Sequence, residues 1–242
     1  MTSSRLGLDR NLRLAWLDTA AAVAARRLTT TETQAALMAA LEGQVPGTTP
    51  QSGRGKTVTV LRRIWFNVPA SAEGLRDRAL TLLAEGDADD RLTLHWAMLL
   101  ATHPFFVDVT AVIGRLLALQ GAFERVQVLR RLAERWGDRS TIARAVPRIL
   151  SSQLEWGVLR LQGEEFSASS KKRVVPPGHA ALLAEAVVLS SPGQTTSLQA
   201  LTGSPMLFPF DVSSAVEWLR RSERFRVHRE GFDVDLVTLS GN

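Results

Sequence analysis

The chain contains no cysteine, which excludes disulfides, thiol catalysis and metal sites built from thiolates. It also lacks any apolar run of about 18 residues, so the sequence predicts no membrane span. Residues 1–5 lead into a polar-studded segment without the apolar stretch of a signal peptide, and we therefore expect a cytoplasmic protein. Lysine is scarce, with 3 Lys against 26 Arg, a bias that a GC-rich genome can produce. The positions of the arginines are therefore more informative than their number.

Catalytic and cofactor motifs are missing as well. The four histidines are scattered, without an i,i+4 pair or nearby carboxylates to complete a metal site: His95, His103, His179 and His228. No G-x-S-x-G elbow or Ser/His/Asp order indicates a triad. The six tryptophans nearly all lie on helical apolar stripes, which favours core packing over base stacking. We expect a protein that is not an enzyme and that binds no metal or cofactor.

One short segment resembles the end of a phosphate-binding P-loop. It reads Gly53-Arg54-Gly55-Lys56-Thr57, but Pro50 stands where the full pattern needs glycine. The P-loop also requires a preceding strand, and this region has a helical pattern. The sequence therefore predicts a basic loop, in which Arg54 and Lys56 remain candidates for phosphate contact at a helix N-terminus.

Up to Gly121 the apolar residues recur with the helical period. Six helices are expected, at 8–28, 29–41, around 58–65, 71–85, 89–102 and 105–120. Thr29 and Glu32 fit a capping box at the start of the second helix. With no convincing strand among them, residues 1–121 are predicted to form an all-α helical bundle.

Residues 122–176 are predicted to form a winged helix-turn-helix. A helix over 124–136 is followed by a Gly137-Asp138 turn and a second helix, capped by Ser140 or Asp138. Pro147 lies within that helix and should kink it. Alternating residues from Val158, and a return from Phe166 toward residue 174, predict a wing.

Residues 177–242 echo this order on a smaller scale. We expect helices at 179–190, 198–201 and 211–222, and then a hairpin over 225–239. Pro205 and Pro209 make the middle of the segment irregular. The predicted fold is therefore mainly α: an N-terminal helical bundle, a winged helix-turn-helix, and a second small α+β winged-helix-like unit.

The charge excess of the chain lies in the middle segment. Residues 122–175 hold 11 Lys or Arg against 6 Asp or Glu, and the other 18 basic and 18 acidic residues balance. Charge concentrated on one such module is typical of a protein that binds duplex DNA. Ten residues are the predicted DNA contacts: Arg130, Arg131, Arg139, Ser140, Thr141, Arg144, Arg148, Lys171, Lys172 and Arg173.

Each group has a role in that interpretation. Ser140, Thr141 and the helix N-terminus would hold phosphates, while Arg144 and Arg148 would enter the major groove. The 171–173 run would follow the backbone or the adjacent minor groove from the wing. The alternative is a solvated helix face whose charge is balanced by three nearby carboxylates: Glu134, Asp138 and Glu155. The order of turn, cap, helix and basic wing favours DNA contact.

The layout resembles the BrxA family of the BREX phage-defence systems. The segments that carry the resemblance are Leu61-Arg62-Arg63-Ile64-Trp65, Trp136-Gly137-Asp138-Arg139-Ser140-Thr141 and Trp156-Gly157-Val158-Leu159. The resemblance covers most of residues 8–175, and the extension after Pro177 is longer than that family leads us to expect. It implies a NusB-like bundle joined to a winged helix, in a small non-enzymatic defence component that binds double-stranded DNA.

Other functions stay open. The chain could be a protein-interaction adaptor that docks other defence-system proteins or members of a larger complex, because fold alone does not determine function. A transcriptional regulator is a further alternative. RNA binding through the bundle is suggested only by the likeness to NusB.

Overall fold

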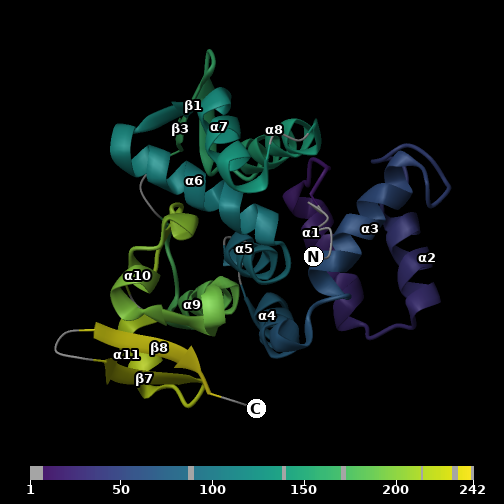
Figure 1. Cartoon of the computed structure of the whole chain (residues 1–242). Coiled ribbons are helices and arrows are strands. Elements are labelled where there is room, and N and C mark those ends of the chain that lie inside the picture. The colour runs from purple at the N-terminus through teal and green to yellow at the C-terminus, as the bar shows by residue number, and fades with distance from the viewer. Residues whose placement is uncertain are drawn as a thin grey trace.

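The computed structural model describes residues 8–86, 90–137, 140–169, 173–213, 215–230 and 234–240. The described chain is mainly α-helical and carries small β-sheets, which confirms the mainly α class predicted from the sequence (Figure 1). No single described helix is both long enough and apolar enough to cross a membrane.

Six helices form the first part, and the described residues before Gly121 contain no strand. Their bounds are α1 (Leu14–Ala25), α2 (Thr30–Ala40), α3 (Gly53–Trp65), α4 (Glu73–Glu85), α5 (Arg91–Thr102) and α6 (Pro104–Gln120), with a 3₁₀ turn at Ala70–Ala72. The capping box is present, because the Thr29 side chain accepts from the Glu32 amide and the Glu32 carboxylate accepts from the Thr29 amide. This arrangement satisfies donors that the first turn of a helix leaves unpaired.

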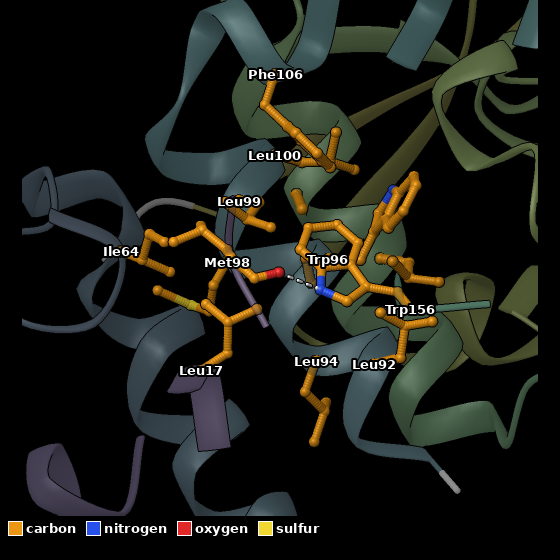
Figure 2. Packing of buried hydrophobic residues seen from close by; sticks show 14 of the residues in the cluster. Leu17, Ile64, Leu92, Leu94, Trp96, Met98, Leu99, Leu100, Phe106 and Trp156 are labelled. Atoms are coloured by element: carbon orange, nitrogen blue, oxygen red, sulfur yellow. Dashed lines mark hydrogen bonds between the residues drawn. The ribbon is translucent and has the colours of Figure 1, made fainter. Parts of the chain in front are cut away.

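Helix α5 lies at the centre of the molecule and is buried on all sides. Every residue from Leu92 to Leu100 is buried, including His95. The Trp96 ring makes edge-on contacts with Phe106 of α6 and with Trp156 (Figure 2). It makes further edge-on contacts with Phe208 and Phe210 from the last third of the chain. Its indole N–H donates to the carbonyl of Met206 at 3.0 Å. One tryptophan therefore joins all three predicted segments in a continuous hydrophobic core.

The middle segment contains the two helices and the hairpin that the sequence predicts, and a strand before them, β1 (Ala122–Glu124), that it does not predict. The other elements are α7 (Arg125–Trp136), α8 (Ser140–Glu155), β2 (Leu159–Gln162) and β3 (Glu165–Ala168). The strands form an antiparallel sheet in the order β1-β3-β2, with Phe123 opposite Phe166 and Leu161 opposite Phe166 on the other side. Helix α8 is continuous from Ser140 to Glu155, with Pro147 inside it.

The C-terminal segment repeats this topology more closely than its sequence suggests. It contains α9 (Pro177–Ser190), β5 (Thr195–Ser197), α10 (Leu198–Thr202), α11 (Ala215–Arg221), β7 (Phe225–Glu230) and β8 (Val234–Leu239), with 3₁₀ turns at Pro192–Gln194 and Pro205–Leu207. Its antiparallel sheet has the order β5-β8-β7. If α6 is counted with the middle segment and α9 with the C-terminal segment, each unit has a helix, a strand, two helices and a hairpin in this order. In each three-stranded sheet, the strand that comes last in the sequence lies in the middle.

The C-terminal segment is joined closely to the middle segment and to the helical bundle. Strand β4 (Arg173–Val174) pairs in parallel with β6 (Phe210–Asp211), and α9 packs against α5. A methyl group on Gly114 of α6 would lie 1.9 Å from the Pro205 carbonyl oxygen, so glycine is needed for the turn at Pro205–Leu207 to approach α6. The C-terminal unit is therefore fixed to the bundle through backbone contact as well as through its core.

A buried carboxylate makes a further connection. Glu185 of α9 is 2% exposed and accepts hydrogen bonds from Arg78 of α4 and from both Nε and Nη2 of Arg224, at 3.2 and 2.8 Å for Arg224. Two guanidinium groups offset the cost of removing one carboxylate from water. The triad joins α4, α9 and the start of the last hairpin.

We expect Glu185→Ala to lower the free energy of unfolding by about 2–3 kcal/mol, because it leaves two guanidinium groups packed against an uncharged site. Urea denaturation measures the change. Glu217→Ala is the matched control, because Glu217 is 84% exposed and lies 3.8 Å from Arg221. It should change stability by less than about 0.5 kcal/mol. Equal effects of the two substitutions would contradict the buried role of Glu185.

His103, at the junction of α5 and α6, is held in its neutral form. Burial, with the nearby Arg63 cation, lowers the pKa of His103 from 6.5 to about 4. Its Nδ1 lies 2.8 Å from the Thr102 hydroxyl, and its Nε2 is buried without a hydrogen-bond partner among the described residues. A proton on Nε2 would thus be an uncompensated buried charge.

Stability should therefore fall as the pH drops from 6.5 toward 4, because the unfolded chain takes up a proton that the folded chain excludes. At pH 5 His103 alone should cost about 2 kcal/mol relative to neutral pH. Urea unfolding of the wild type and of His103→Asn at pH 7 and pH 5 tests this expectation. The variant should lose less stability on acidification, and an identical loss in both proteins would rule out His103 as a source.

Candidate nucleic-acid interface

Helix α8 divides into a buried face and an exposed face. Its inward side chains are Ile142, Ala145, Val146, Ile149, Leu150, Ser152 and Gln153. The predicted contact residues Ser140, Thr141, Arg144 and Arg148 are all exposed and follow the helical period on the opposite side. The structure therefore brings these four residues together on one open helix face.

The exposed arginines of α8 are not neutralised by any carboxylate of the described residues. Arg144 Nε lies 3.4 Å from the Ser140 carbonyl of the preceding turn. Within the described parts of the chain, neither Arg144 nor Arg148 forms an ion pair. Glu155, one of the carboxylates expected to balance them, accepts instead from the Leu14 amide at 3.0 Å. Glu134 lies 3.9 Å from Arg131, and Asp138 falls outside the described residues.

The C-terminal end of α8 is attached to the segment that precedes α1. Ser152 Oγ accepts from the Leu12 amide at 2.8 Å, and the Trp156 indole N–H donates to the Leu12 carbonyl at 2.9 Å. These contacts join residues 140 or more positions apart, so no local pattern in the sequence indicates them. They fix the direction of α8 while its N-terminal half stays open.

Helix α7 packs against α6 and α8, buries Val128 and Leu132, and forms one polar cluster with α6. Asp108 of α6, nearly buried, accepts from Arg135 Nη1 at 2.6 Å and from the Trp136 indole N–H at 2.8 Å. Arg135 is thereby engaged within the protein. The predicted contacts Arg130 and Arg131 are exposed on the same helix.

The hairpin differs from the predicted basic wing. Strand β3 ends at Ala168, and Arg173 lies in β4, which pairs with β6 of the C-terminal segment. Arg173 is therefore not on the hairpin, because its backbone is used in a different sheet. Lys171, Lys172 and the predicted contact Arg139 lie outside the described residues. The hairpin tip carries exposed Glu164 and Glu165, with Arg160 on β2.

An apolar groove lies between α7 and the hairpin, and the sequence pattern did not predict it. The groove has a volume of about 470 Å³ and is lined by Glu124, Arg125, Val126, Leu129, Leu161, Gly163, Glu164 and Phe166. Val126 is 61% exposed and Leu161 is 48% exposed, so two aliphatic side chains present apolar surface in this groove. Alternation along β2 indicates which residues face outward, but not that α7 places Val126 beside them.

The segment that resembles a P-loop has a structural role. Residues 53–57 form the first turns of α3, and Arg54 is buried, with its guanidinium donating to the carbonyls of Val45 at 3.1 Å and Met38 at 3.3 Å. Arg54 is therefore not available for phosphate contact, whereas Lys56 is exposed. Within the described ranges, no three His, Asp or Glu side chains lie close enough together to hold a metal ion.

Comparison of the chain with protein-family models, with curated proteins and with solved structures gives no match.

The exposure of the α8 face can be tested by thiol labelling, because the wild-type chain has no cysteine. Thr141→Cys, on the open face, should react with a maleimide at close to the rate of a free thiol. Ala145→Cys is the matched control one helical turn away, where the native side chain is 1% exposed. Its reaction should be slower by at least about a hundredfold, because it requires opening of the fold. Comparable labelling rates would show that positions 141 and 145 do not differ in solvent exposure, which would contradict the open face of α8.

Proposed function

We propose that the protein binds double-stranded DNA through the exposed face of α8, and that residues 104–168 act as a winged helix-turn-helix. The observation that carries this proposal is the set of exposed polar and cationic side chains on α8 that no carboxylate of the described chain neutralises. Duplex DNA is the polyanion that such a face fits most simply, because an α-helix enters its major groove.

The order and pairing of the elements support this assignment. Helix α6 is followed by β1, α7, α8 and the β2–β3 hairpin, and β3 lies between the other two strands. In helix-turn-helix proteins the second helix of the pair lies in the major groove and the first crosses the backbone. Here α8 would be the recognition helix, and α7 would present Arg130 and Arg131 to the phosphates.

The N-terminal half of α8 supplies two kinds of contact. Ser140 and Thr141 are exposed at the helix start, where hydroxyls, free amides and the helix dipole favour a phosphate group. Arg144 and Arg148 lie one turn apart on the same face and would reach base edges or opposite phosphates. The backbone contacts would set the register, and the arginines would provide any preference for sequence.

The hairpin has a smaller part in this proposal than the sequence alone suggests. Glu164 and Glu165 are exposed at its tip, and phosphates repel carboxylates. The main contact is therefore α8, and the duplex would pass the hairpin on the side of Arg160 rather than at the tip.

A place for the protein in a bacterial phage-defence system, as a non-enzymatic accessory component, is part of the same proposal. It rests on the resemblance of the three sequence segments to the BrxA family.

A protein-interaction adaptor is the second candidate, and the groove between α7 and the hairpin favours it. Val126 and Leu161 expose apolar surface there, and Arg125, Glu124 and Glu164 surround it with both signs of charge. An apolar centre with a polar rim is typical of a surface that binds another protein.

Charge reversal on α8 tests the DNA proposal. Arg148→Glu should weaken duplex binding at least about tenfold, and should reduce the slope of log affinity against log salt by about one to two units. Fluorescence anisotropy with a labelled duplex at several salt concentrations measures both quantities. Arg26→Glu is the matched control, because Arg26 is exposed at the far end of α1 and its reversal changes the net charge equally.

Equal weakening by the two substitutions would show that duplex affinity follows the total charge and not the α8 face. An absence of duplex binding at low salt would reject DNA binding, and the adaptor function would then stand as the better account. Circular dichroism of both variants establishes that the fold is retained.

A further inference from the structure

A polar pocket lies at the opposite end of α1 from α8. It has a volume of about 330 Å³ and lies among the end of α1, the start of α2, the end of α3 and the first turns of α4. Its lining includes residues whose side chain is positively charged or can donate a hydrogen bond, among them Arg27, Thr30, Arg62, Trp65, Asn67 and Arg76. The pocket is separate from the proposed DNA interface, because α1 spans 12 residues, or about 18 Å.

Three arginines reach this pocket from three different parts of the bundle. Arg27 follows α1, Arg62 lies on α3 and Arg76 lies on α4. One carboxylate, Asp77, also lines the pocket and is bound to Arg76 at 2.9 Å. The lining therefore keeps an excess of two positive charges. A cluster of like charges around one pocket costs free energy, which an anion in the pocket would offset.

Arg27 is held in an unusual backbone conformation at the edge of the pocket. Its φ angle is +51°, in the left-handed region, where residues other than glycine are disfavoured. This is the position after a helix end that glycine commonly occupies. An arginine here accepts strain that glycine would avoid, and it places a guanidinium beside the pocket.

Two buried donors in the pocket wall have no partner within the described chain. Arg62 Nη1 donates to Gln34 Oε1 at 3.2 Å, which fixes the side chain, but its Nε is buried and unpaired. The indole N–H of Trp65 is also buried and unpaired, and Trp65 itself is 0% exposed. Unpaired buried donors are uncommon, and both of these belong to residues that line the pocket.

From this geometry we infer that the pocket binds a phosphate group. Guanidinium groups form paired hydrogen bonds with both carboxylates and phosphates. A planar carboxylate offers oxygens in two directions, whereas a tetrahedral phosphate has oxygens for donors that approach from three sides. The three arginines come from three elements around the pocket, and this arrangement fits the tetrahedral anion. The phosphate belongs either to a small molecule such as a nucleotide or to a nucleic-acid backbone.

Inorganic phosphate is the first probe, titrated into the full chain in a phosphate-free buffer at constant ionic strength. Binding should raise the midpoint of thermal unfolding in proportion to the logarithm of phosphate concentration above the dissociation constant. Arg27→Gly should weaken phosphate binding about tenfold, the loss of one charge-assisted contact. Without phosphate the same variant should unfold at an equal or higher temperature, because glycine relieves the strained backbone.

Arg26→Gly is the control, since it removes the same charge one residue away, from a side chain that does not line the pocket. It should leave phosphate affinity unchanged. A second variant, Arg76→Gln, should reproduce the loss seen with Arg27→Gly. The inference is overturned if phosphate does not stabilise the wild type beyond chloride at equal ionic strength, or if Arg26→Gly and Arg27→Gly weaken binding equally.

Competition then identifies the source of the phosphate. Displacement of bound phosphate by AMP, but not by an oligonucleotide, indicates a small-molecule ligand, and the converse indicates a nucleic-acid backbone. Both results support the pocket as a phosphate site. The phosphate titration contains no duplex, so failure of this inference is distinguishable from failure of duplex binding on α8.

Discussion

The burial of α5 on every side is the constraint on which the rest of the structure depends. A helix without a polar face has to be enclosed, and here the neighbours that enclose it come from the whole length of the chain. Trp96 shows how closely: aromatic rings from α6, from the end of α8 and from residues 208–210 surround it, and a backbone carbonyl at Met206 accepts its N–H. Burial of such a ring contributes both apolar area and favourable edge-on geometry. The position of α8, and hence the direction of its open face, follows from this enclosure.

The helices of the bundle could be predicted from the sequence because their signals are local. The capping box at Thr29 and the apolar period of 105–120 lie within a few turns of chain, and the structure has helices at these places. The open face of α8 was predictable for the same reason, since Arg144 and Arg148 are one turn apart. The predictions that were wrong depend on long-range contacts. Arg173 was expected on the hairpin, but its strand pairs with β6 instead. Arg54 was a candidate for phosphate contact, but it is buried and donates to the carbonyls of Val45 and Met38. Neither partner can be located from the pattern around the residue itself. The groove at Val126 and the pocket at Arg27 were missed because each is formed where separate elements meet.

The arginines of the chain fall into classes that their number does not reveal. Some are structural: Arg54 donates to carbonyls, Arg135 holds Asp108, and Arg78 and Arg224 enclose Glu185. Others are exposed and have no carboxylate partner among the described residues, as Arg144 and Arg148 do. The planar guanidinium serves both purposes, because it tolerates burial when its donors are satisfied and remains charged at any accessible pH. An arginine-rich composition therefore indicates little about nucleic-acid binding until each side chain is assigned a partner or shown to lack one.

The contact between Gly114 and Pro205, together with the strand pairing of β4 with β6, has a consequence for how the two three-stranded sheets can work together. Modules joined by a flexible linker search for their second binding site, and the length of the linker sets the effective concentration. Here no such search is available, because the two modules share a core and touch through their backbones. The two modules therefore keep a fixed distance and orientation relative to each other. Any partner that binds both modules at once has to match a spacing that the protein itself determines. Binding of such a partner loses no conformational entropy for ordering the two modules relative to each other.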